Sequence, residues 1–388
     1  MKNLVQQLEK AFLFSPIFLV LISIFNFTDT KSLVSRIAVI VIAYSIIRYK
    51  QCIKSNFDQY NYKKFFLASI LIFTYFSIMH FWRGDNFGLP RTLITCLVYL
   101  SVVPWGKFSK EWFYNTVVLS AYICGFNAIY EHYYLNMIRV GMAINPIPYA
   151  LYCSFLSLSS LALVRCYKSI PMQCVCILGF LFALWALILT DSRGVWIAYP
   201  IVALFVIYKV FNSFSYTKLS VLTLIGLGVA YFSFQPIIDE RIGLTLYELK
   251  SIGQGNFDTS IGVRLQLWQF GVENWVEKPV LGLGDIMLEE GIGKIPARGA
   301  YHQPHLHNQF LDTLSRYGVV GMLVVLYWLC YPMIFIKNTD YGTIISCSLA
   351  MLILIAGLSD VPLHHTHIVY LFTLVVGVGA LLKQGNQS

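Results

Sequence analysis

The sequence predicts an all-α polytopic membrane protein of about 12 transmembrane helices with one large, mostly helical polar loop. Of its 388 residues, 57% are hydrophobic and only 12% are charged. In soluble proteins, about a quarter of the residues are charged. The mean hydropathy is +0.65. Its apolar runs suit helices of about 20 residues, and no series of short alternating segments indicates a β-barrel.

Apolar runs divide the chain into nine spans, a polar segment and three more spans. The expected spans lie at 11–27, 33–48, 64–82, 90–104, 112–131, 147–167, 171–190, 195–210, 218–235, 318–337, 342–360 and 365–382. We therefore assign helices 1–9 to residues 1–235, the polar loop to 236–317, and helices 10–12 with the C-terminus to 318–388. No small-residue cleavage site follows the first run, which predicts a retained span instead of a signal peptide.

The basic residues of the short loops predict the orientation. Fifteen of these lysines and arginines lie on the side of the two termini and six on the other side. The richer side is expected to be cytoplasmic, so the polar loop faces outward. The net charge of +9 then fits anchoring at anionic membrane lipids and requires no nucleic acid. All nine cysteines fall in spans or inside, so we expect no disulfide framework.

Inside the polar loop, one amphipathic helix is expected from about Ser260 to Glu277, where apolar residues recur at helical intervals. Thr259 and Ser260 would cap its start. Its two tryptophans suit a membrane interface. A Gly-Leu-Gly sequence at 282–284 is weak support for a nucleotide-binding loop, because no strand precedes it and it faces away from the cytoplasm.

The most distinctive stretch is 301–318, which contains three histidines within six residues. Apolar residues at helical spacing after Pro304, with Asp312 and Arg316 four residues apart, predict an amphipathic helix that ends near Gly318. His307 would lie on or just before its first turn, and Asn308 follows beside the apolar stripe. Because a span begins directly afterwards, this helix should stand at a membrane surface.

Three arginines on the outer side are candidate anion ligands, since a guanidinium fork suits phosphate oxygens. Arg264 would add its charge to the positive end of an amphipathic helix. Arg193 lies at the outer end of a span, where snorkelling or a pair with Asp191 is an equally good interpretation. Arg139, just before the sixth span, has a similar alternative.

The histidines allow three interpretations. A neutral imidazole at His307 could take a proton from an attacking hydroxyl, which is general base catalysis. His302, His305 and His307 could instead bind a metal. Their spacing lacks the i,i+4 pair that places two ligands on one helical face, and no cysteine or closely spaced carboxylate completes a set, so we expect no metal. Solvated loop histidines without a specific role are the third possibility.

Several motifs occur here as they do in bacterial O-antigen ligases. They are Asn145-Pro146, Asp191-Ser-Arg-Gly194, Arg264-Leu-Gln-Leu-Trp268, Pro279-Val-Leu-Gly-Leu-Gly284, and His305-Leu-His-Asn308 continuing to Gly318-Val-Val-Gly321. The sequence thus resembles the O-antigen ligase and polymerase superfamily in detail over about residues 130 to 330. His-Asn followed by Gly-x-x-Gly is the most specific motif.

This resemblance implies a GT-C-like glycosyltransferase in the inner membrane of a Gram-negative bacterium, with its active site facing the periplasm. Such ligases transfer polysaccharide from undecaprenyl diphosphate to a sugar hydroxyl of lipid A-core. Arg193 and Arg264 would then hold the diphosphate leaving group, and His307 would deprotonate the hydroxyl, with inversion at the anomeric carbon. No metal is expected to bridge the diphosphate, since no Asp-x-Asp motif occurs in the loop. No other cofactor is expected.

Further candidates for substrate binding are Arg139, His305 and Asn308, the last of which could orient the acceptor or the imidazole. Two other functions stay open. A polymerase of the same superfamily would use the same donor and a second carrier-linked glycan as acceptor. A transporter of lipid-linked glycan is disfavoured, because no acidic or basic residue lies near the middle of an expected span.

Overall fold

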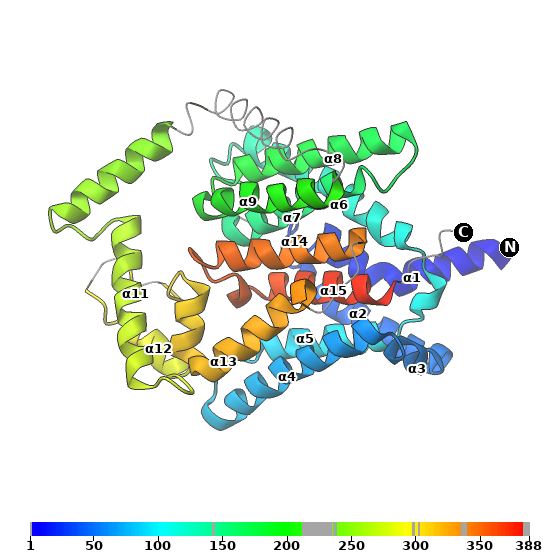
Figure 1. The fold of residues 1–388 in the computed structure, drawn as a ribbon, viewed down its shortest axis with the longest axis horizontal. Coiled ribbons are helices and arrows are strands. Elements are labelled where there is room, and N and C mark those ends of the chain that lie inside the picture. The colour runs from blue at the N-terminus through cyan, green and yellow to red at the C-terminus, as the bar shows by residue number, and fades with distance from the viewer. Residues whose placement is uncertain are drawn as a thin grey trace.

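The computed structural model is a bundle of α-helices around two strongly buried helices, α7 and α15 (Figure 1). It describes residues 2–141, 144–211, 235, 239–296, 299–301, 303–334 and 340–382. Within these ranges the secondary structure is helical throughout, without a strand. The expected fold class is confirmed at this level, whereas the GT-C-like arrangement stays a prediction.

The helices follow the chain in short succession. In the first half they are α1 (Lys2–Ile22), α2 (Thr30–Tyr49), α3 (Cys52–Phe57), α4 (Tyr60–Arg83), α5 (Gly88–Val102), α6 (Lys110–Ile129), α7 (Pro146–Leu163), α8 (Ile170–Leu189) and α9 (Arg193–Val210). A helical segment at 239–253 follows, and then α11 (Ser260–Glu277), α12 (Asp285–Ile292), α13 (Gln309–Ile334), α14 (Tyr341–Ala356) and α15 (Thr366–Leu381).

Seven of the described helices are long and apolar enough to cross a membrane, namely α1, α2, α4, α7, α8, α9 and α13. The shorter apolar helices α5, α14 and α15 and the 20-residue α6 also coincide with expected spans. The expected span at 218–235 lies almost wholly outside the described residues, as does the start of the polar loop. A polytopic membrane protein is therefore supported, and the number of twelve spans remains a prediction.

Helix α7 forms much of the centre because almost all of its residues are buried. It begins with Pro146, whose missing N–H is harmless at this position, and the Asn145 side chain accepts a hydrogen bond from Ile147 N at 2.9 Å. Serines recur among its buried residues, and small side chains let neighbouring helices approach closely. The Asn145-Pro146 turn thus begins a core helix next to the site described below.

Helix α13 bends sharply at Gly318, where φ is 64°, a backbone region that favours glycine. A Cβ atom there would lie 2.2 Å from the carbonyl carbon of Val280. Residues 279–284 run alongside the bend, and Leu283 N donates to Ser315 O at 2.8 Å. Gly318 interrupts the helical backbone of α13, so the expected helix end near this residue is confirmed. The Gly-Leu-Gly sequence packs against the bend and hydrogen-bonds to it.

The helices of the polar loop lie at the opposite end of the bundle from the start of α1 (Figure 1). Helix α11 has the expected bounds Ser260–Glu277, and the Thr259 hydroxyl caps it by accepting from Gly262 N at 3.1 Å. A small separate core joins α11 to α12 and to the loop before α13; it consists of Val263, Leu267, Leu288, Ile292, Ala300 and Leu306. This core positions the histidine loop.

Another face of α11 stays uncovered. Leu265, Val272 and Val276 are 40%, 42% and 67% exposed. Apolar residues outside the packed face are what a helix lying at a membrane interface requires. The placement of this helix at the interface remains a prediction.

Candidate active site

His307 occupies the residue before the cap of α13. The Asn308 side-chain oxygen accepts hydrogen bonds from Phe310 N at 3.0 Å and Leu311 N at 3.1 Å, and its amide donates to Leu358 O at 3.1 Å. Asn308 is therefore bound to the protein as a helix cap. His307 has a φ of 50°, which is uncommon for a residue with a side chain and is often found at functional sites.

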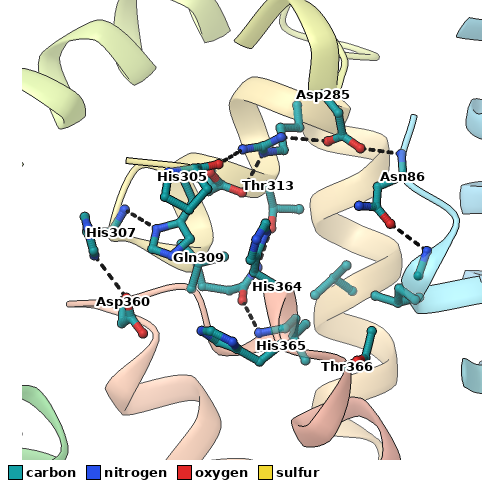
Figure 2. Close-up of a pocket in the computed structure, with 18 of the residues that line it drawn as sticks. Asn86, Asp285, His305, His307, Gln309, Thr313, Asp360, His364, His365 and Thr366 are labelled. Carbon is teal, nitrogen blue, oxygen red and sulfur yellow. Dashed lines mark hydrogen bonds and ion pairs between the residues drawn. The ribbon is translucent and has the colours of Figure 1, made fainter. Parts of the chain in front are cut away.

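The His307 ring lies between two polar side chains. Its Nδ1 is 3.0 Å from Asp360 Oδ1 (Figure 2), and its Nε2 is 2.7 Å from Gln303 Oε1. When Nδ1–H donates to Asp360, Nε2 carries a lone pair and can accept from the Gln303 amide with its N and O atoms exchanged. One nitrogen is thus held by a carboxylate while the other can accept a proton.

Asp360 lies in the turn after α14 and is only 3% exposed. Burial raises the pKa of its carboxyl, but the hydrogen bond with His307 and the nearby histidines lower it more, so the net shift is downward. Asp360 is therefore ionised at neutral pH. Its second oxygen, Oδ2, is buried and makes no hydrogen bond within the described part of the chain.

His305 lies directly against His307, with ring centroids 4.5 Å apart. Its Nδ1 accepts a weak hydrogen bond from the His307 backbone N–H at 3.4 Å. Burial lowers the pKa of His305 to about 3, so this ring is neutral at physiological pH. It is therefore no solvated loop histidine. His302 lies outside the described residues.

His305, His307 and Asp360 each offer a potential metal-ligand atom, and these atoms lie within 4.8 Å of one another. Both donor types, imidazole nitrogen and carboxylate oxygen, are ones that zinc accepts. Asp360 supplies the carboxylate that the sequence spacing did not place beside the histidines, because it is 53 residues from His307 along the chain. The same three groups are also suited to acid–base chemistry: His307 is the candidate base, the Asp360 carboxylate orients its ring, and His305 is a neutral neighbour.

A cavity of about 530 Å³ opens beside His307, with His305 and Asp360 also in its wall (Figure 2). Arg316 supports its other side, because its Nη1 is 2.9 Å from Asp285 Oδ1 and its Nε is 2.9 Å from Asp312 Oδ2. The expected Asp312–Arg316 pair is confirmed. Arg316 Nη2 also donates to Pro304 O at 2.6 Å, which fastens the histidine loop to α13.

Arg193 begins α9 and contacts the helical segment 239–253. Its Nη1 donates to Thr245 Oγ1 at 3.2 Å, and its Nη2 is 3.5 Å from Glu248 Oε1. A pair between Arg193 and Asp191 was one interpretation of the sequence, but Asp191 instead forms an ion pair with Arg241. Arg241 had no distinguishing signal in the sequence, since it lies in no recognised motif.

Arg264 is half-buried in α11 and has few partners. Its Nη1 donates to Ser260 Oγ at 3.1 Å, and its buried Nε has no hydrogen-bond partner among the described residues. Burial lowers the pKa of Arg264; the Asp360 carboxylate opposes this shift and Arg193 adds to it. Arg264 therefore lies within electrostatic range of both Arg193 and Asp360.

Arg139 belongs to the same cluster of cations. Its Nε donates to Thr190 O at 3.2 Å. Burial lowers the pKa of its guanidinium, and the charges of Arg241 and Arg193 lower it further. The structure thus places Arg193 within electrostatic range of both Arg139 and Arg264, although none of the three arginines lines the cavity.

Comparisons with known proteins cover the part of the chain that carries most of this site. A family model described as O-antigen ligase matches residues 178–326, a range that contains Arg193, Arg264 and His307. The O-antigen ligase of Escherichia coli K12 is 26% identical over 279 residues, which cover 68% of this chain and 65% of that protein. An uncharacterized protein of Haemophilus influenzae is 26% identical over 173 residues, covering 42% of this chain and 43% of its own length.

The match therefore covers less than two thirds of either relative. The match to the family model includes Arg193, Arg264 and the loop that carries His307, whereas Arg139 lies outside it. In its helical membrane architecture and in these two matches, the chain is similar to the O-antigen ligase superfamily.

Proposed function

We propose that the protein is an O-antigen ligase, an inverting and metal-independent glycosyltransferase. It transfers polysaccharide from undecaprenyl diphosphate to a sugar hydroxyl of lipid A-core at the periplasmic face of the inner membrane. The observation that carries this proposal is the contact between His307 and Asp360 at the wall of a cavity, with Arg264 within electrostatic range. A base and an anion site then meet at the outer end of a helical bundle.

His307 acts as the general base. Asp360 accepts the Nδ1–H, so the lone pair of Nε2 faces the position that Gln303 now occupies at 2.7 Å. The acceptor hydroxyl displaces the Gln303 amide there. As the hydroxyl oxygen attacks the anomeric carbon, its proton moves to Nε2, and the Asp360 carboxylate stabilises the imidazolium.

The arginines bind the leaving group. The bond between the anomeric carbon and the phosphate oxygen breaks, and its electron pair remains on undecaprenyl diphosphate. Arg264, with a buried and unpartnered Nε in the described structure, and Arg193, with one long contact to Glu248 at 3.5 Å, stabilise this growing negative charge. A single displacement of this kind inverts the anomeric configuration. Arg139 adds to the positive potential behind them.

A polymerase of the same superfamily could use an identical base and diphosphate site with a different acceptor. Deletion of the gene followed by gel analysis of lipopolysaccharide separates the two functions. We expect loss of all O-antigen from lipid A-core, with carrier-linked polymer accumulating. A core that carries one repeat unit would instead identify a polymerase.

The experiment that tests the mechanism is transfer by the purified, reconstituted protein carrying His307→Ala. General base catalysis typically contributes about 10²- to 10⁴-fold, so the rate should fall by that order while the donor still binds. His132→Ala is the matched control, because His132 lies outside the cavity and its ring contacts the Met137 carbonyl. Full activity of His307→Ala would end the assignment of the base.

The same assay with EDTA separates the base from a metal site. We expect the wild-type activity to be unchanged when EDTA is added. Activity that EDTA removes and zinc restores would favour metal binding by His305, His307 and Asp360.

A further inference from the structure

The cavity beside His307 carries a second set of cations, Lys31 from α2 and Arg91 from α5. Lys31 Nζ donates to Thr366 Oγ1 at 2.8 Å. A Cβ atom at Gly88, about one turn before Arg91, would lie 3.3 Å from the Thr366 methyl group,. Thr366, at the start of α15, therefore joins α2 and the first turn of α5 at one wall of the cavity (Figure 2).

These two cations differ from the other charges of the cavity. Arg316 pairs with Asp285, Glu289 and Asp312, and His307 pairs with Asp360. No described Asp or Glu lies within 4.0 Å of Lys31 or Arg91. A half-buried lysine without a counter-charge is unfavourable until an anion joins it. This wall of the cavity is therefore suited to a negatively charged ligand.

His365 adds a hydrogen-bonding group at the same wall. It lies next to Thr366 and lines the cavity, and its buried Nε2 has no partner in the described structure. Burial lowers the pKa of His365 to about 4, and Lys31 is among the charges that lower it. The ring is thus neutral at physiological pH and close to Lys31, so it can donate a hydrogen bond to a ligand without adding charge.

We propose that Lys31, Arg91 and His365 bind a phosphate group on the saccharide of the acceptor glycolipid. This inference rests on the proposed function. Because His307 lines the cavity, the cavity offers an acceptor hydroxyl a route to the base. Arg193 and Arg264, which hold the donor diphosphate, do not line the cavity. The two anions are therefore bound at separate places, and the acceptor phosphate positions its hydroxyl against His307.

The test compares the reconstituted wild type with the double variant Lys31→Gln/Arg91→Gln on two acceptors, lipid A-core and the same lipid after enzymatic dephosphorylation. With the phosphorylated acceptor, the KM for acceptor should rise about tenfold or more, since two charge-assisted contacts are lost. The KM for donor should stay constant. Dephosphorylation should raise the wild-type KM similarly and change the variant little.

Arg36→Gln is the matched control, because Arg36 is an exposed cation on the same helix that does not line the cavity. An equal rise in KM for both acceptors would overturn the proposal. A raised KM for donor would assign the cations to the diphosphate. An effect that follows only the content of anionic phospholipid in the liposomes would assign them to a lipid headgroup.

Direct binding of the two acceptors, measured without donor, keeps this inference separate from the proposed function. A wild type that transfers polysaccharide to neither acceptor would refute the function alone. Weaker binding of the phosphorylated acceptor by the double variant would still support the subsite. Equal binding of both acceptors by the wild type would refute it.

Discussion

Arg316 and Arg264 both come from the polar segment around His307, but the protein satisfies them to different degrees. Arg316 is 3% exposed, and its nitrogens contact Asp285, Asp312 and the Pro304 carbonyl. Arg264 contacts only the Ser260 hydroxyl, and its Nε is buried without a partner in the described chain. A guanidinium whose donors are used by the protein maintains the fold, whereas one with an unused buried donor is available to an anion.

The surroundings of the two arginines differ in the same sense. Arg316 lies among carboxylates. Arg264 lies within electrostatic range of Asp360, Arg193 and Glu248, but it forms no ion pair within 4.0 Å with a described residue. If the proposed diphosphate binds at Arg264 and Arg193, it relieves the repulsion between these two cations. This difference leads to predictions that separate stability from activity.

The largest expected effect is on stability. Arg316→Met leaves Asp285 and Asp312 buried without their counter-charge, which typically costs about 3–5 kcal/mol. We expect a much lower Tm and yield of monodisperse protein in detergent, measured by size exclusion after heating. Arg264→Met should keep the wild-type Tm, because among the described residues Arg264 forms no ion pair and hydrogen-bonds only the Ser260 hydroxyl. If Arg316→Met were as stable as wild type, the structural assignment of this arginine would fail.

Asp360→Asn should lower activity without lowering the protein level. The amide keeps the shape of the side chain but cannot stabilise an imidazolium or select the Nδ1–H tautomer, and comparable substitutions cost up to about 10⁴-fold. We expect kcat to fall by about 10²-fold or more, with a smaller change in the KM for acceptor. A drop confined to KM would make Asp360 a binding residue.

A smaller loss is expected for Arg264→Lys. Lysine keeps the charge but loses the paired geometry of the guanidinium, so ligation should fall by about 10-fold or more, as for loss of one charged hydrogen bond. Arg36→Lys, on an exposed position of α2, is the control in the same transfer assay. Near-normal activity of Arg264→Lys would reduce Arg264 to a structural residue.

A pH dependence of stability is also expected. His305 has its pKa lowered by burial from 6.5 to about 3, so below pH 6.5 the unfolded chain binds a proton that the folded chain does not. Stability should therefore fall as the pH decreases from 6.5 towards 3, by roughly 2 kcal/mol at pH 5 at 1.36 kcal/mol per pH unit. Tm measured at pH 7.5 and pH 5 checks this. His305→Gln should make the dependence shallower without removing it, because burial also lowers the pKa of His365, to about 4. An unchanged slope would contradict the assignment to His305.

Much of the local structure was predictable because it depends on residues close together in the sequence. The bounds of α11, the helix end at Gly318 and the Asp312–Arg316 pair are read from helical periodicity and spacing. Eleven of the expected spans coincide with helices, since a long apolar run has few alternatives in a membrane. The family motifs added Arg193, Arg264 and His307 by likeness to known proteins.

The sequence by itself thus determined the membrane class, the helices and the candidate base. Only the tertiary structure paired His307 with Asp360 and Lys31 with Thr366, residues 53 and 335 positions apart. It also gave Asp191 to Arg241 instead of Arg193. The physical reason is that periodicity records which face of a helix is buried, whereas the packing of that face against distant helices decides which polar groups meet.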